Sequence, residues 1–158
     1  MVRKIDIQII IGSKSDESKI KPALETLAEF NVLYDFKVAS AHRSPEFVQE
    51  VIDNAINNGV KVFITGAGMA NHLSGTVAAR TTLPVIGIPF SGGVSGGIDS
   101  LLATVQMPPG VPVATVAVDG AKNAAILALE IISIENKELQ KKLMEYRHKE
   151  AERIKAER

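Results

Sequence analysis

Short apolar segments alternate with amphipathic helical segments along the whole chain, and this alternation constrains the fold more than any other feature. Runs rich in β-branched and apolar residues predict five strands, at residues 5–11, 32–39, 60–65, 84–88 and 111–118. A helical pattern follows each strand after a short connection. Strands and helices that alternate in this way form an open parallel sheet with helices on both faces. The predicted fold class is therefore α/β.

The last part of the chain differs from the rest. Residues 135–158 are densely charged, with a narrow apolar stripe of Leu139, Leu143, Tyr146 and Ile154 at helical spacing. Two interpretations stay open: a solvated terminal helix, or a helix that packs on a neighbouring subunit. We accordingly divide the chain into an α/β domain at residues 1–134 and a terminal helix at residues 135–158.

Composition excludes several classes of function. Lys plus Arg and Asp plus Glu both number 18, so no basic field favours nucleic acid or a membrane surface. The absence of cysteine excludes disulfides and a thiolate nucleophile. The apolar run near the amino end is too short for a signal peptide core, and no segment is long enough to span a bilayer. A cytoplasmic protein is expected.

Three polar or glycine-rich segments follow the first three predicted strands, at residues 12–16, 40–45 and 66–75. In an open parallel sheet, ligands bind beyond the carboxyl ends of the strands. Nine of the twelve glycines lie between positions 66 and 110, which suggests backbone close to a ligand or to another segment. We expect the three segments to meet at one edge of the sheet.

The first segment, residues 12–16, fits a phosphate group. Gly12, Ser13, Ser15 and Asp16 precede a helix, where backbone N–H groups and the helix dipole favour anions. Alternatively, Ser15 or Asp16 simply caps the helix. The segment lacks the first glycine of a Walker A loop.

The second segment, residues 40–45, combines a proton carrier with a permanent cation. Ser40 and Ala41 precede His42 and Arg43. An Arg side chain binds two phosphate oxygens at once, and His suits general acid–base chemistry near neutral pH. A His42 that only bonds to backbone at the start of a helix is the alternative.

The third segment contains the second His of interest. Ala67 and Gly68 let backbone approach a flat ring, and His72 and Leu73 follow. Asn71 occupies the third glycine position of a dinucleotide fingerprint, which argues against that motif. A packed, hydrogen-bonded His72 is the alternative. Two such His residues without cysteine argue against a structural zinc site.

Taken together, these segments resemble the aminoimidazole ribonucleotide carboxylase and mutase family, from about residue 7 to residue 146. The resemblance continues beyond them in order, through residues 84–89, 99–102, 105–108, 111–115 and 123–124. Many motifs in the same order make this resemblance specific.

The resemblance implies a flavodoxin-like three-layer sandwich, a homo-octamer whose terminal helix contacts a neighbour, and a reaction in de novo purine biosynthesis. It implies that His42 carries the proton. The phosphate would be held by Ser13, Ser15, Ser40 and Arg43. Asp16 would bind sugar hydroxyls, while Ala67, Gly68, His72 and Leu73 would line the ring and carboxylate. The implied scheme passes through CO2 and uses no metal, ATP, biotin or other cofactor.

The family has two branches. One rearranges a carbamate, moving carboxylate from the exocyclic nitrogen to carbon 4; the other carboxylates aminoimidazole ribonucleotide directly with CO2. Arg43 and His72 resemble the first, mutase, branch, whereas Asn71 and Ser74 lean toward the second. Met69 and the glycine-rich loop at residues 91–97 are further departures from the usual mutase pattern.

Two other classes of function remain open. A flavin- or nucleotide-binding module on this fold would use the same strand ends. A non-catalytic receiver-like domain would place an acidic residue such as Asp16 after the first strand, but would have no use for His42 and His72.

Overall fold

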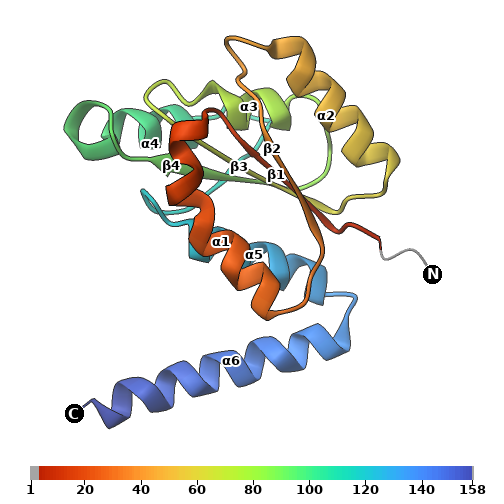
Figure 1. The fold of residues 1–158 in the computed structure, drawn as a ribbon, viewed down its shortest axis with the longest axis vertical. Coiled ribbons are helices and arrows are strands. Elements are labelled where there is room, and N and C mark those ends of the chain that lie inside the picture. Colours follow the sequence, from red (N-terminus) through yellow and green to blue (C-terminus); the bar gives the residue numbers. More distant parts are fainter. Residues whose placement is uncertain (1–3, 158) are drawn as a thin grey trace.

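A computed structural model describes residues 4–157, and its strands form one parallel sheet in the order β2-β1-β3-β4-β5 (Figure 1). The elements are β1 (Ile7–Ile11), η1 (Lys14–Asp16), α1 (Glu17–Glu29), β2 (Tyr34–Val38), α2 (Pro45–Asn57), β3 (Val62–Gly68), α3 (His72–Ala78), β4 (Val85–Phe90), η2 (Val94–Gly97), α4 (Ile98–Val105), β5 (Ala114–Thr115), α5 (Ala121–Ser133) and α6 (Lys137–Ala156). The predicted α/β class and five-stranded parallel sheet are confirmed. This strand order is the flavodoxin-like one.

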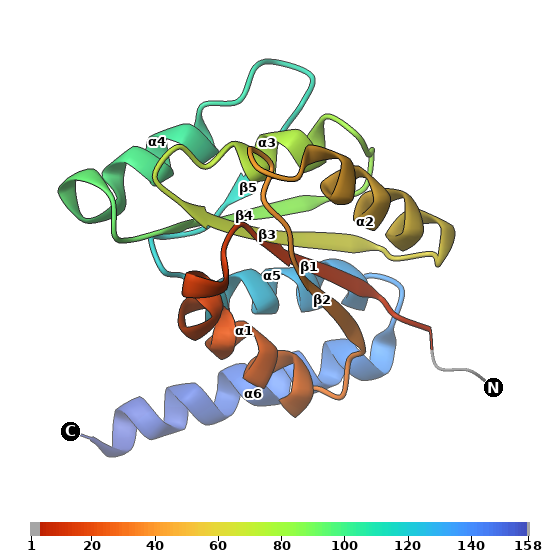
Figure 2. The ribbon, with the colours of Figure 1, turned by 45° about the horizontal axis from the view of Figure 1, so that its top comes forward.

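Helices cover both faces of the sheet and make three layers. Helices α1 and α5 lie on one face, and α2, α3 and α4 lie on the other (Figure 2). In β1, Ile9 and Ile11 pack toward α1 and α5, while Ile10 packs toward α2. All three are fully buried. Burial on both faces explains why β1 reads as a continuous apolar run rather than an alternating one.

The fifth strand is shorter than the sequence predicts. Instead of residues 111–118, only Ala114–Thr115 form a ladder with β4. Pro112 has no N–H to donate to a ladder. The chain nevertheless continues beside β4, because the N–H of Val116 donates to the carbonyl of Gly87 at 3.1 Å and that of Asp119 to the carbonyl of Pro89 at 2.9 Å.

The end of β4 also departs from the prediction. The strand extends to Phe90 rather than ending at residue 88, and the expected loop contains the short 3-10 turn η2. Within that turn, Ser95 and Gly96 have φ values of 52° and 67°. Glycine adopts this left-handed backbone conformation readily, whereas residues with a Cβ rarely do, which accounts for the glycine-rich composition of the loop.

Helix α6 joins the core at its start and leaves the domain at its end. Leu139 and Leu143 are buried in the cluster beneath α1 and α5, and the rings of Phe30 and Tyr146 meet edge to face at 5.6 Å between centroids. The carboxyl-terminal end of α6 extends past the domain (Figure 1), and Ile154 is 54% exposed.

The packing of α6 on a neighbouring subunit stays a prediction, as does the division of the chain at residue 134. Residues 1–3 and 158, at the outer ends of both predicted regions, lie outside the described residues.

None of the helices in residues 4–157 combines the length and apolar character needed to cross a bilayer.

Candidate active site

A cavity of about 640 Å³ opens at the carboxyl ends of β1, β2 and β3. The three polar segments that follow these strands all border it, as the sequence predicts. Every predicted site residue lines the cavity: Gly12, Ser13, Ser15, Asp16, Ser40, Ala41, His42, Arg43, Ala67, Gly68, His72 and Leu73. The fold therefore brings the predicted phosphate, proton-transfer and ring-binding groups into one space.

The segment after β1 is capped by Ser13. The Ser13 hydroxyl accepts a hydrogen bond from the N–H of Ser15 at 3.3 Å and lies 2.9 Å from the Ser15 hydroxyl. Asp16 occupies the N-cap position of α1 but makes no side-chain capping bond. Asp16 thus occupies the predicted N-cap position of α1 without a capping bond, and the side-chain capping bond observed is that of Ser13 at the start of η1.

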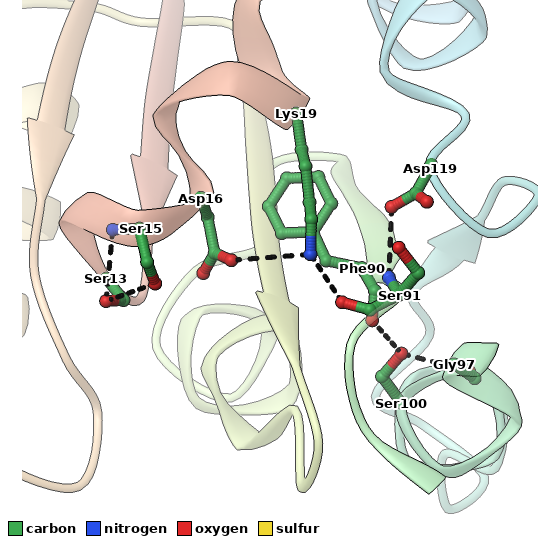
Figure 3. Close-up of polar contacts among 9 residues, drawn as sticks. All are labelled: Ser13, Ser15, Asp16, Lys19, Phe90, Ser91, Gly97, Ser100 and Asp119. Atoms are coloured by element: carbon green, nitrogen blue, oxygen red, sulfur yellow. Dashed lines mark hydrogen bonds and ion pairs between the residues drawn. The ribbon is translucent and has the colours of Figure 1, made fainter. Parts of the chain in front are cut away.

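Asp16 is a buried carboxyl group with two charged neighbours. It is 9% exposed, its Oδ1 lies 3.9 Å from Nζ of Lys19, and it lies in the group of polar side chains shown in Figure 3. Burial raises the pKa of Asp16; Lys19 opposes this rise, and Asp119 adds to it. Ionisation of Asp16 therefore lowers the free energy of unfolding, and the charge of Lys19 partly offsets this loss.

His42 and His72 contact each other across the cavity. Nε2 of His42 lies 2.6 Å from Nδ1 of His72, and the two rings meet edge to face with centroids 4.7 Å apart. One of the two nitrogens donates and the other accepts, so a single proton lies between them. This bond joins two side chains, so the backbone-bonded interpretation of His42 is not the arrangement observed.

Within residues 4–157, no three His, Cys, Asp or Glu side chains are grouped closely enough to hold a metal ion.

Arg43 is held over the cavity by the loop that carries it. Its Nε and its backbone N–H both donate to the Ser40 hydroxyl, at 3.3 and 3.2 Å, and its Nη2 donates to the carbonyl of Gly12 at 3.4 Å. The Ser44 hydroxyl donates to the Ser40 carbonyl at 3.1 Å and closes the turn. The guanidinium group is thus placed beside the serines that follow β1, where an anion would meet both.

Asn71 and Ser74, the departures from the mutase pattern, do not line the cavity. They are 1% and 0% exposed. The Asn71 amide donates to the Thr104 hydroxyl at 2.8 Å, and the Thr65 hydroxyl donates to that of Ser74 at 2.8 Å. This network ties α3 to β3 and α4, so these residues act on the cavity by fixing the position of α3.

Five residues of the cavity wall were not predicted: Lys19, Met69, Ala70, Ser91 and Gly92. The sequence could have indicated Lys19 as part of the cavity wall, because it stands three residues after Asp16 and therefore on the same face of a helix. Ser91 and Gly92 follow β4, and only the three-dimensional path of the loop places them at the cavity.

Comparison with known proteins gives consistent results. A family model described as AIR carboxylase matches residues 6–153. The N5-carboxyaminoimidazole ribonucleotide mutase of Pyrococcus abyssi is 53% identical over 141 residues, covering 89% of this chain and 81% of that protein. The phosphoribosylaminoimidazole carboxylase of Candida glabrata is 44% identical over 97% of this chain but only 27% of that protein.

A solved structure agrees with the sequence matches. The structure of PurE from Treponema denticola matches with a TM-score of 0.86 at 30% identity, covering 94% of this chain and 92% of that one.

Replacement of Asp16 by Asn tests the energetic cost of the buried carboxyl group. Its raised pKa means that the folded protein holds a proton more tightly than the unfolded chain, so stability falls as pH rises through the folded value. We expect Asp16→Asn to increase the free energy of unfolding at neutral pH, and the gain to shrink as pH falls toward the ordinary carboxyl value of 3.8. Urea unfolding over a pH series measures both effects.

The matched control is Glu17→Gln, a change at the exposed neighbouring residue, for which we expect no such gain. If Asp16→Asn is less stable than the parent at neutral pH, ionisation of the buried Asp16 carboxyl group does not destabilise the fold.

Proposed function

Because the chain belongs to the AIR carboxylase family, we propose that it is an N5-carboxyaminoimidazole ribonucleotide mutase of purine biosynthesis. It converts 5-(carboxyamino)imidazole ribonucleotide to 4-carboxy-5-aminoimidazole ribonucleotide. The observation that carries this proposal is that one cavity holds both the His42–His72 pair and the anion-binding group around Arg43. Family membership favours this enzyme over a flavin-binding module or a receiver-like domain.

The polar end of the cavity binds the ribose 5-phosphate in this proposal. Ser13, Ser15 and Ser40 supply hydroxyl donors, and Arg43 supplies a cation that its bonds to Ser40 hold in place. The carboxylate of Asp16 accepts hydrogen bonds from sugar hydroxyls. The contribution of Asp16 to binding depends on its ionised form.

The other end of the cavity takes the imidazole ring. Small residues at Ala67 and Gly68 let the ring approach the backbone, while Gly12, Ala41 and Leu73 complete the wall. The histidine pair then lies beside the carbon and nitrogen atoms that exchange the carboxyl group.

The proposed reaction breaks one bond to the carboxyl carbon and makes another. As the carbamate C–N bond breaks, its electron pair stays on the exocyclic nitrogen, which takes a proton from His42. Carbon 4 of the electron-rich ring attacks the released CO2, and His42 then removes the proton from that carbon. His72 orients His42 through the hydrogen bond between their rings. The proton returns to its origin, and neither redox chemistry nor group transfer to a cofactor is involved.

Confinement of CO2 contributes as much as the acid–base step. A well-placed acid–base group gives roughly 10²–10⁴-fold acceleration, while effective molarities for well-oriented reactants reach about 10⁵–10⁸ M. A site that retains CO2 therefore favours its recapture by carbon 4 over its escape.

Direct carboxylation of aminoimidazole ribonucleotide by CO2 is the second candidate. The similarity to the C. glabrata carboxylase favours it. Both reactions share the attack of carbon 4 on CO2 and the role of His42, so the site supports either. They differ in the source of CO2.

We expect the protein to act as a homo-oligomer, and the octamer of the family is the proposed form. Helix α4 presents a stripe of Ile98, Leu102 and Val105, each about half exposed, spaced to share one helix face. The end of α6 extends beyond the domain. These are surfaces that further copies of the chain would bury.

The substrate of the proposed enzyme carries a phosphate group. Because charged phosphates do not cross bilayers unaided, we place the enzyme in the cytoplasm.

A pair of ultraviolet assays tests the proposed function. One supplies the carbamate ribonucleotide without bicarbonate, and the other supplies aminoimidazole ribonucleotide with bicarbonate. Fast formation of 4-carboxy-5-aminoimidazole ribonucleotide from the carbamate is the expected result. Turnover only with high bicarbonate would assign the direct carboxylase instead, and no turnover in either assay would refute an enzyme of this family.

Replacement of His42 by Asn tests the proton carrier. Asn keeps a polar side chain of similar reach but cannot carry the proton, so kcat should fall about 10²–10⁴-fold. Binding of ribose 5-phosphate, measured by calorimetry, should change little. His148→Asn, an exposed change on α6, is the control. Near-normal turnover by His42→Asn would show that His42 is not the proton carrier.

Replacement of Leu102 by Lys tests the assembly. A charge in the middle of the α4 stripe would be buried without a partner in an oligomer, so the variant should dissociate into smaller species. Analytical ultracentrifugation measures the mass, and circular dichroism verifies the fold. Glu138→Gln, at an exposed site on α6, should keep the parental mass. A parental mass for Leu102→Lys would exclude α4 from the interface.

A further inference from the structure

Lys19 lies on the cavity wall at the junction of three segments. It stands in the first turn of α1, three residues after Asp16, and its ammonium group donates to the carbonyl of Ser91, beyond the end of β4. The same Nζ lies 3.9 Å from the Asp16 carboxylate and 5.8 Å from the centroid of the Phe90 ring. Figure 3 shows Lys19 reaching across from the helix to the loop.

The residue that Lys19 holds is fixed from both sides. The carbonyl of Ser91 accepts from Lys19, and its N–H donates to Oδ1 of Asp119 at 3.0 Å. Ser91 and the following Gly92 both border the cavity. Two side chains of opposite charge therefore set the position of the wall that the β4 loop contributes.

These same two side chains are the charged neighbours of Asp16. Lys19 comes from α1 and Asp119 from the segment before α5, while Arg43, His42 and His72 lie on other walls of the cavity. Lys19 lowers the pKa of Asp16 against the combined effect of burial and Asp119. Without the ammonium group, the pair of carboxylates would lack a compensating charge.

We propose that Lys19 is a positioning residue for the ribose end of the substrate. It holds the Ser91–Gly92 wall in place and keeps Asp16 able to accept hydrogen bonds from sugar hydroxyls. The inference rests on the proposed function for the identity of the substrate, and on the contacts of Lys19 for its role. Lys19 acts through Asp16 and Ser91 and takes no part in proton transfer at carbon 4.

Three substitutions separate the two parts of this role. Lys19→Met removes both the charge and the hydrogen bond to Ser91, Lys19→Gln removes the charge but keeps a donor, and Lys19→Arg keeps both. Lys21→Met is the matched control, since Lys21 is on the same helix, is exposed and pairs with Glu25 at 3.5 Å.

Steady-state kinetics over a pH series is the test. We expect Lys19→Met to raise KM about tenfold with little change in kcat, because the Ser91–Gly92 wall loses its charged donor and Asp16 loses the charge that favours its ionised form. The acid limb of kcat/KM should move to higher pH in Lys19→Met and Lys19→Gln, because Asp16 then protonates more readily. Lys19→Arg should restore the parental limb, and Lys21→Met should match the parent throughout.

Calorimetry with ribose 5-phosphate makes the result independent of turnover. If the parent binds this probe and Lys19→Met binds it about tenfold more weakly, the role of Lys19 holds even if the parent turns over neither substrate. Parental KM, pH profile and ribose 5-phosphate affinity in Lys19→Met would overturn it. Equal losses in all three Lys19 variants, with a lowered urea midpoint, would also overturn it, because they would show a purely structural role.

Discussion

The hydrogen bonding of β1 to β2 on one side and to β3 on the other is the constraint on which the site depends. Helix α1 leaves β1 toward one face of the sheet, and α2 leaves β2 toward the opposite face. The loops at the ends of these strands therefore diverge and leave a crevice between them. Residues 12–16, 40–45 and 66–75 border the same cavity because parallel strands bring all their carboxyl ends to one edge.

Much of this arrangement could be predicted from local sequence, and the exceptions have physical causes. A strand such as β1, buried on both faces, is a continuous apolar run that periodicity detects. The short β5 was overestimated because apolar composition does not report which N–H groups reach β4. Ser91 was missed because its contact with Lys19 spans 72 residues, and no local pattern places the segment after β4 beside the first turn of α1.

The buried polar network beneath α3 changes how Asn71 and Ser74 should be understood. Both stand within a motif that borders the cavity, yet their side chains point into the interior and bond to Thr104 and Thr65. A buried network of this kind is rigid when every member is satisfied. In this chain, Asn71 and Ser74 therefore bear on the cavity through the placement of α3, and with it of His72, rather than through the cavity wall.

Asp16 places stability and binding in opposition at a single side chain. Its burial makes the ionised carboxyl group unfavourable for folding, whereas the proposed binding of sugar hydroxyls needs that ionised form. If the proposed role of Asp16 holds, directed evolution that screened only for heat resistance would enrich neutral residues at position 16 and yield stable but inactive proteins. Any programme to make this enzyme more stable should keep Asp16 and seek its gains away from the cavity.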